Sequence, residues 1–172
     1  MDLILLPGNS KNNEKWIEEI AQILSEYFDS CEILKYRHWK TGGELLNFET
    51  ELDKLREFIK KSKNYALFAK SAGVILALKA IKSGAKPKKC VFLGAPILWA
   101  KEAGIEVESL FSNNISTLFI QQTGDPVISF LELKRFLECS SMKNYKIVEV
   151  RGDDHHYAEI RKIREIVLKF LK

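Results

Sequence analysis

Residues 65–81 read YALFAKSAGVILALKAI, and this stretch decides the fold. Its first part, Tyr65 to Ala69, is an apolar run of strand length, which is typical of a strand buried on both faces. Its second part, Val74 to Ile81, is apolar on most of a helical circumference, and Gly84 then provides a stop signal. The stretch therefore predicts a central strand that turns sharply into a heavily buried helix.

Short apolar runs and helical stripes alternate on both sides of this stretch. Five further runs of strand length are Leu3 to Leu6, Ile33 to Tyr36, Cys90 to Leu93, Thr117 to Ile120 and Tyr145 to Val150. Helical spacing marks residues 16–27, 48–59, 130–137 and 160–170, and Asn47 is suited to cap the second of these helices. Because strands that alternate with helices build parallel sheets, we predict a three-layer α/β/α fold with a mostly parallel six-stranded sheet. We expect a single domain over residues 1–172.

Composition and charge exclude several classes of protein. Of the 172 residues, 46% are hydrophobic and 29% are charged, which excludes disordered and fibrous chains. The net charge of +4 is spread along the sequence, and the one dense basic stretch, Lys86 to Lys89, fits a solvated loop. We therefore expect no nucleic-acid partner. No apolar stretch reaches about 18 residues, so we expect no membrane partner either.

The cysteines and the first loop argue against metals and nucleotide cofactors. Cys31, Cys90 and Cys139 lie far apart and form no metal-binding spacing, so we expect free thiols, a cytoplasmic location and no metal site. The loop Pro7-Gly8-Asn9-Ser10, which follows the first predicted strand, has neither of the glycine-rich nucleotide fingerprints. We expect no cofactor.

Ser71 stands at the turn between the central strand and the buried helix. A nucleophile on such a turn needs small residues two positions away on each side, and Ala69 and Gly73 meet this need. The helix that starts beside Ser71 also directs backbone N–H groups toward an oxyanion that forms there. The alternative is that Ser71 only caps the helix, because serine is a preferred N-cap residue.

An acid and a histidine follow two later strands. Asp125 lies in Gly124-Asp125-Pro126 after the fifth run, and the sixth run is followed by Gly152-Asp153-Asp154-His155-His156. Loops after parallel strands emerge on one edge of the sheet, so these residues can meet Ser71 despite their separation. Taken singly, Asp125 could be an ordinary turn former and either histidine could be solvated. The order Ser, Asp, His is the order of the α/β-hydrolase triad.

Over nearly its whole length the chain resembles the α/β-hydrolase family, and within it the small lidless serine hydrolases akin to dienelactone hydrolases. The resemblance rests on Leu5 to Asn9, Phe68 to Gly73, Gly124 to Pro126 and Gly152 to His155. It implies a minimal α/β-hydrolase fold, an oxyanion hole made by the backbone N–H groups of Asn9 and Ala72, and His155 rather than His156 as the base. The sequence departs from the family pattern at Ala69, where glycine is usual, at Pro7, where histidine is common, and in its small size.

Three further side chains are candidate substrate contacts. The segments 37–39 and 97–99 follow predicted strands, so they are expected to wall an open cleft. His38 could touch substrate there, and Trp39 and Trp99 could form an apolar pocket for an acyl or alcohol group. The alternatives are a solvated loop histidine and tryptophans that pack in the core or at its rim.

The sequence thus predicts an esterase or thioesterase that acts on a small acyl substrate through Ser71, His155, Asp125 and an acyl-enzyme. We expect a monomer or a small homo-oligomer. A non-catalytic hydrolase-fold binding or scaffold protein is the alternative, because a fold does not imply a function. A flavodoxin-like nucleotide or flavin binder would share the same kind of sheet.

Overall fold

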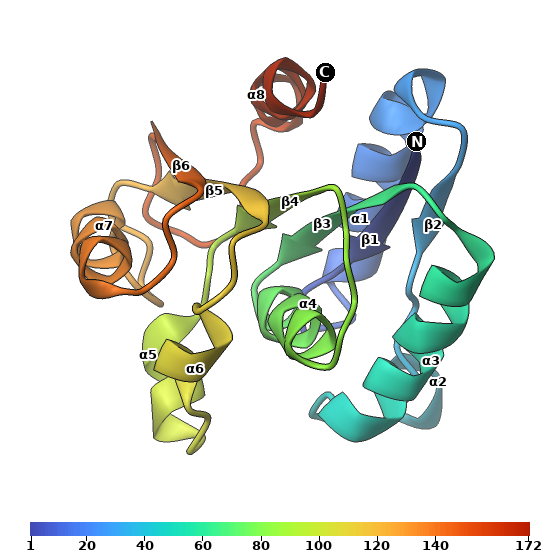
Figure 1. Cartoon of the computed structure of the whole chain (residues 1–172), viewed down its shortest axis with the longest axis horizontal. Helices are drawn as coiled ribbons and strands as arrows, with labels where there is room; N and C mark the ends of the chain where they lie inside the picture. Colours follow the sequence, from blue (N-terminus) through green and yellow to red (C-terminus); the bar gives the residue numbers. More distant parts are fainter.

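A sheet of six parallel strands runs through the middle of the protein (Figure 1). The computed structural model describes residues 1–172. The strands follow the order β2-β1-β3-β4-β5-β6 across the sheet, and every neighbouring pair is parallel. Their bounds are β1 (Asp2–Leu6), β2 (Cys31–Ile33), β3 (Tyr65–Lys70), β4 (Lys89–Leu93), β5 (Ser116–Gln122) and β6 (Tyr145–Val150). The predicted fold class is confirmed, and the sheet is parallel throughout.

Helices cover both faces of this sheet (Figure 1). Helices α1 and α8 pack on one face, and the remaining helices lie on the other face or at its carboxyl edge. The bounds are α1 (Asn13–Leu24), α2 (His38–Thr41), α3 (Phe48–Lys61), α4 (Ala72–Lys82), α5 (Ile97–Glu102), α6 (Val107–Leu110), α7 (Phe130–Cys139) and α8 (Ile160–Leu171). A short 3₁₀ turn, Ser25–Tyr27, follows α1. None of these helices is long and apolar enough to cross a membrane.

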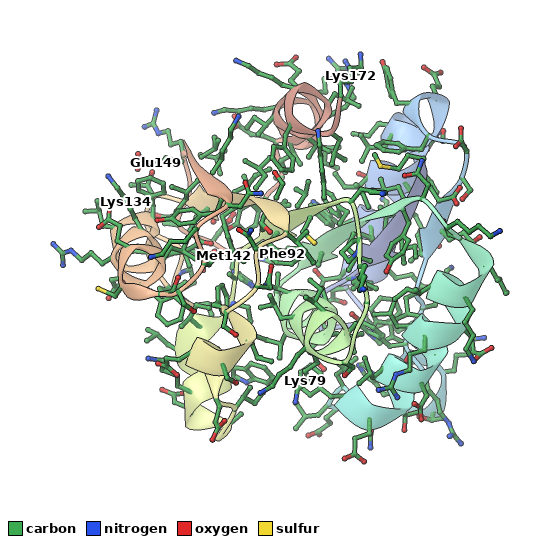
Figure 2. All side chains as sticks on the ribbon, viewed as in Figure 1. Lys79, Phe92, Lys134, Met142, Glu149 and Lys172 are labelled. Carbon is green, nitrogen blue, oxygen red and sulfur yellow. The ribbon has the colours of Figure 1, made fainter.

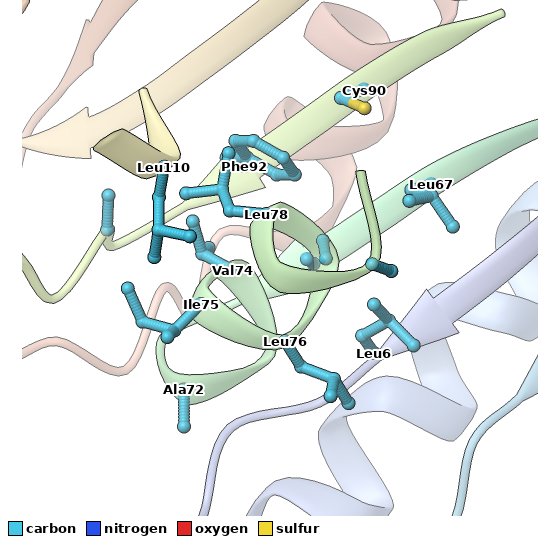
Figure 3. Close-up of a cluster of buried hydrophobic side chains, with 14 of the residues drawn as sticks. Leu6, Leu67, Ala72, Val74, Ile75, Leu76, Leu78, Cys90, Phe92 and Leu110 are labelled. Atoms are coloured by element: carbon cyan, nitrogen blue, oxygen red, sulfur yellow. The ribbon is translucent and has the colours of Figure 1, made fainter. Parts of the chain in front are cut away.

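Helix α4 is the centre of the larger core. Its apolar circumference is buried as the sequence predicts, and Figure 3 shows Val74 and Leu78 turned toward Phe92 of β4, with Leu76 on the side of Leu6 in β1. Side chains fill the space between the sheet and the helices (Figure 2). Phe92 and Met142 lie in the interior of the protein, and Lys134 and Lys172 lie at its periphery. The N-terminus of α4 is therefore held in one place relative to β1, β3 and β4.

Gly73 allows the close approach of α4 to β1. A Cβ atom at this position would lie 2.4 Å from the carbonyl oxygen of Leu6 and 2.6 Å from that of Pro7. Both neighbours are backbone atoms, one in β1 and the other bonded by the Tyr36 hydroxyl, so they cannot move aside as a flexible side chain would. Glycine is required at this position by the strand-turn-helix geometry.

We expect Gly73→Ala to destabilise the protein by about 1–3 kcal/mol, because an added methyl in a packed site forces the backbone to shift. The measurement is the urea midpoint of unfolding at constant slope. An unchanged midpoint would show that α4 can move away from β1 at no cost, and would contradict the tight turn.

The secondary structure predicted from the sequence was wrong in two respects. The second strand ends at Ile33, and the apolar residues Leu34 and Tyr36 lie beyond it, buried beside α3. The strand pairs with β1 alone, and its last ladder bond is donated by the Leu34 N–H to the carbonyl oxygen of Leu5. Three short helices were also not predicted, because each is too short to show a helical period: α2 after β2, and α5 and α6 between β4 and β5.

Candidate active site

Ser71 sits on the turn between β3 and α4 with a backbone that serine rarely adopts. Its φ is +51° and its ψ is −123°, which costs of order 1–3 kcal/mol for a residue with a side chain. The Ser71 N–H donates to the carbonyl oxygen of Leu93, which ties the turn to β4. The Ser71 side chain accepts no helix N–H, so it does not serve as a helix cap.

The Ser71 hydroxyl is bonded to His155 instead. Ser71 Oγ lies 3.0 Å from His155 Nε2, and His155 Nδ1 lies 2.8 Å from Asp125 Oδ2 and 2.9 Å from Asp125 Oδ1. An ionised carboxylate only accepts hydrogen bonds, so Nδ1 of a neutral His155 carries the proton. Nε2 is then free to accept the hydroxyl proton of Ser71. His156 is exposed, and its side chain is not part of this chain of bonds.

Asp125 is held as a carboxylate. Its side chain has no exposed surface, and it accepts hydrogen bonds from the Val127 N–H at 2.9 Å and the Tyr157 hydroxyl at 2.8 Å, besides those from His155. Burial raises the pKa of Asp125, but the bonds and charge of His155, together with those two donors, lower the pKa below its ordinary value. Asp125 therefore remains negatively charged beside the imidazole at neutral pH.

Three residues that support this arrangement were not found from the sequence. Gln122 ends β5, and its Oε1 accepts the His155 N–H at 2.9 Å, which fixes the loop backbone at the histidine. Gly94, after β4, has a φ of +56°, and a Cβ there would lie 2.7 Å from His155 Cε1. Tyr157 bridges the Gln122 N–H and Asp125 through its hydroxyl. The one available signal was the polar pair Gln121-Gln122 at the end of an apolar strand.

We expect Tyr157→Phe to lower the kcat for an ester about 10-fold without changing KM, because Tyr157 contacts Asp125 and not the open side of Ser71. A hydrogen bond to a charged group is worth about 1.5–3 kcal/mol. Burial and the charge of Asp125 raise the pKa of the Tyr157 hydroxyl well above its ordinary value, so this donor stays protonated at every working pH. Steady-state kinetics check the effect, with the exposed Tyr27→Phe as control. Equal kcat values in both variants would contradict a positioning role for Tyr157.

The loop after β1 holds Asn9 in a fixed position at the carboxyl edge of the sheet. The Asn9 carbonyl oxygen accepts hydrogen bonds from His38 Nε2 and Trp39 Nε1, both at 2.8 Å. Its side chain donates to the Glu44 carbonyl oxygen at 2.9 Å and accepts from the Leu46 N–H at 2.7 Å. Four hydrogen bonds therefore fix this residue, and its own N–H is bonded to no acceptor in the protein. The Ala72 N–H is likewise free, because Ala72 begins α4.

The candidate substrate contacts lie differently from the prediction. Trp39 is only 7% exposed, packs edge-on against Tyr36 and bonds Asn9, so its indole supports the loop rather than an apolar pocket. His38, at the start of α2, is half-buried and bonded to the Asn9 carbonyl oxygen, so it is not a solvated histidine. Trp99 is 37% exposed on α5 and packs against Phe48 of α3. The two tryptophans therefore do not share a pocket, and only Trp99 offers an exposed apolar surface.

No group of three or more His, Cys, Asp or Glu side chains is arranged to hold a metal ion. A serine, a histidine, a carboxylate and free backbone N–H groups lie at the carboxyl edge of the sheet, in the loops that follow β1, β3, β5 and β6. The strand order reverses between β1 and β3, and ligands of open parallel sheets bind at such a point. Such a set can attack a carbonyl carbon, transfer the proton and stabilise the oxyanion.

Comparisons with known proteins address the fold. No protein-family model and no curated protein sequence matches the chain. Among solved structures, an esterase from Pyrococcus furiosus superposes with a TM-score of 0.80 at 18% identity, over 99% of this chain and 79% of that chain. A cold-adapted esterase from an Arctic intertidal metagenomic library gives 0.75 at 13% identity, over 99% and 80%. A serine hydrolase involved in carbazole degradation gives 0.73 at 14% identity, over 99% and 90%.

A flavodoxin-like sheet has the strand order 2-1-3-4-5, which the first five strands of this sheet also follow. Strand order alone therefore does not distinguish a hydrolase from a flavodoxin-like nucleotide or flavin binder. The similar structures are described as esterases or a serine hydrolase, and each superposes over 99% of this chain. The chain has the α/β-hydrolase fold.

Proposed function

We propose that the protein is a serine hydrolase that cleaves a small carboxylic ester or thioester through an acyl-enzyme on Ser71. The observation that carries this proposal is the continuous chain of hydrogen bonds from Ser71 Oγ through His155 to Asp125. Nothing about folding requires these three side chains to meet at the ends of three different strands. Two of the similar structures are described as esterases and a third as a serine hydrolase, which agrees with the same chemistry.

The reaction proceeds in two acyl transfers. Ser71 Oγ attacks the carbonyl carbon while His155 Nε2 takes the hydroxyl proton, and the N–H groups of Asn9 and Ala72 stabilise the oxyanion. The bond to the alcohol or thiol breaks, and His155 returns the proton to the leaving group. Water then attacks the acyl-enzyme with His155 again as base, the acid leaves, and the proton returns to Ser71. Asp125 stabilises the imidazolium in both steps.

The finer assignment within the fold is part of this proposal. The short chain carries only the small helices α5 and α6 between β4 and β5, and Leu98 and Trp99 of α5 are exposed. This helix follows β4 at the same edge of the sheet as Ser71, and an exposed apolar surface there suits the small lidless hydrolases akin to dienelactone hydrolases that the sequence resembles. We expect modest selectivity for the substrate group that contacts this apolar surface.

A fluorophosphonate tests the nucleophile directly, because this reagent labels only activated serines. We expect one adduct in the intact mass of the wild type, located by peptide mass on Ser71 and absent from Ser71→Ala. A folded wild type that acquires no adduct would favour the alternative, a binding or scaffold protein with a hydrolase fold.

A further inference from the structure

Lys70 is a buried cation beside the proposed nucleophile. It is the last residue of β3 and is only 4% exposed, on the face of the sheet that α1 and α8 cover. Lys70 Nζ donates to Asn13 Oδ1 at 2.7 Å and lies 5.0 Å from the centre of the Trp16 ring. No carboxylate of the protein forms an ion pair with it. An ammonium has three donors, so two of them have no acceptor within the protein.

A buried lysine without a counterion is uncommon, because removing the charge from water is costly unless it is paired. Burial lowers the pKa of Lys70 to about 8, and the charges of Asp125 and Asp154 offset only part of this effect. The lysine is therefore still mainly protonated at neutral pH. A site that keeps such a cation without a counterion in the protein is suited to bind an anionic ligand.

Lys70 lines a cavity of about 290 Å³ between the loop before α1 and the loop before α8. Its other lining residues include Asn12, Asn13, Trp16 and His155. The walls are fixed, since Trp16 Nε1 donates to the Tyr157 carbonyl oxygen at 3.0 Å and Asn13 Nδ2 donates to the Ser10 carbonyl oxygen at 3.0 Å. The N-terminal end of α1 borders the cavity and adds partial positive charge.

The position of the cavity indicates which part of a substrate would enter it. The cavity shares His155 with the proposed active site, but not Asn9, Ser71 or Ala72. His155 delivers the proton to the leaving group, so a group in this cavity lies on the leaving-group side of the reacting carbonyl. Asp154 also lines the cavity, and its negative charge disfavours a dianion such as a phosphate ester. A single carboxylate fits this balance of charge.

We propose that the Lys70 cavity binds a carboxylate carried by the leaving group, so that the preferred substrates are esters of hydroxy acids. This proposal rests on the proposed function, which it deepens by naming a substrate class. The carboxylate accepts hydrogen bonds from the two unused donors of Lys70 Nζ, and the reacting ester oxygen lies next to His155 Nε2.

Two matched esters test the selectivity. The anion 4-acetoxybenzoate and its neutral methyl ester carry the same acyl group and differ by one carboxylate charge. We expect wild type to prefer the anion in kcat/KM, and Lys70→Met to lower the ratio of anionic to neutral ester by about 10- to 100-fold, as for the loss of a hydrogen bond between charged groups. Lys134→Met, on the outer side of α7 (Figure 2), should leave the ratio unchanged. If Lys70→Met does not fold, Lys70→Gln replaces it in the same comparison of the two esters.

The pH dependence of the same ratio tests the charge of Lys70. The wild-type ratio should fall as the pH rises through about 8, the pKa of Lys70, and should be flat in Lys70→Met. The groups that face Lys70 are Asp154, His155 and His156 in the loop before α8 and Asp125 after β5; the loop before α1 contributes no charged side chain to the cavity. His155 transfers the proton for both esters, so its catalytic contribution cancels in the ratio. His156→Gln should show the same fall.

Direct binding separates this proposal from the proposed function. Calorimetry with 4-hydroxybenzoate, the alcohol product, requires no turnover, and we expect its Kd to rise at least 10-fold in Lys70→Met. Equal affinities in wild type and variant, or a pH-independent ratio of the two esters, would overturn the Lys70 proposal even if both esters are cleaved. Lys70-dependent binding without cleavage of either ester would instead overturn the esterase proposal and leave the carboxylate site standing.

Discussion

Ser71→Ala should lose about 10⁶-fold in kcat on a short-chain nitrophenyl ester, because removing the nucleophile of a triad removes the function of the whole unit. The substitution deletes one oxygen atom, which bonds His155 at 3.0 Å and caps no helix N–H. Alanine meets the same positive φ as serine at this turn, so the stability of the protein should change little. The measurement is the initial rate of nitrophenolate release.

The control for this loss is the exposed Ser112→Ala, whose hydroxyl bonds only the Ser109 carbonyl oxygen. We expect wild-type turnover from this control and an unchanged melting temperature from both variants. Turnover by Ser71→Ala within 10-fold of wild type would remove Ser71 from the mechanism, and with it the proposed acyl-enzyme.

The sequence predicted those parts of the structure in which the burial of a residue follows from its neighbours along the chain. The runs Leu3 to Leu6 and Tyr65 to Ala69 are apolar because central parallel strands are covered on both faces, so periodicity alone located β1 and β3. The need for a small residue at Gly73 was predicted for the same local reason, because strand, turn and helix crowd together within five residues. These features need no knowledge of distant partners.

The supporting residues of the candidate site could not be predicted, because their roles depend on partners far away in the sequence. Tyr157 and Asp125 are 32 residues apart, and Trp39 and Asn9 are 30 apart. No local pattern indicates that an indole N–H will fix the carbonyl oxygen of one particular loop residue. Lys70 shows the same limit, since a lysine at the end of an apolar strand is normally exposed, and here α1 covers it.

Asp125→Asn should lower kcat/KM by about 10⁴-fold, through a change of tautomer in His155. The carboxylate accepts from His155, Tyr157 and the Val127 N–H, whereas an amide has only one accepting atom. The Val127 N–H cannot rotate, so it retains the amide oxygen, and the amide NH₂ then faces His155 Nδ1. The imidazole must accept there and carry its proton on Nε2, where it can no longer take the proton of Ser71.

The rate of fluorophosphonate labelling of Ser71 should fall with kcat/KM, because both steps require the same proton transfer to Nε2. Asp153→Asn is the matched control: this neighbouring carboxylate is exposed and bonds no side chain of the site, so turnover should stay within about twofold of wild type. Activity of Asp125→Asn within 10-fold of wild type would mean that another carboxylate orients the base. Asp154 is the nearest such group along the chain, but its Oδ1 already accepts from Gln122 Nε2 and the His156 N–H, both at 2.9 Å. These two bonds hold the Asp154 carboxylate away from His155 Nδ1, and a move to replace Asp125 there would have to break them.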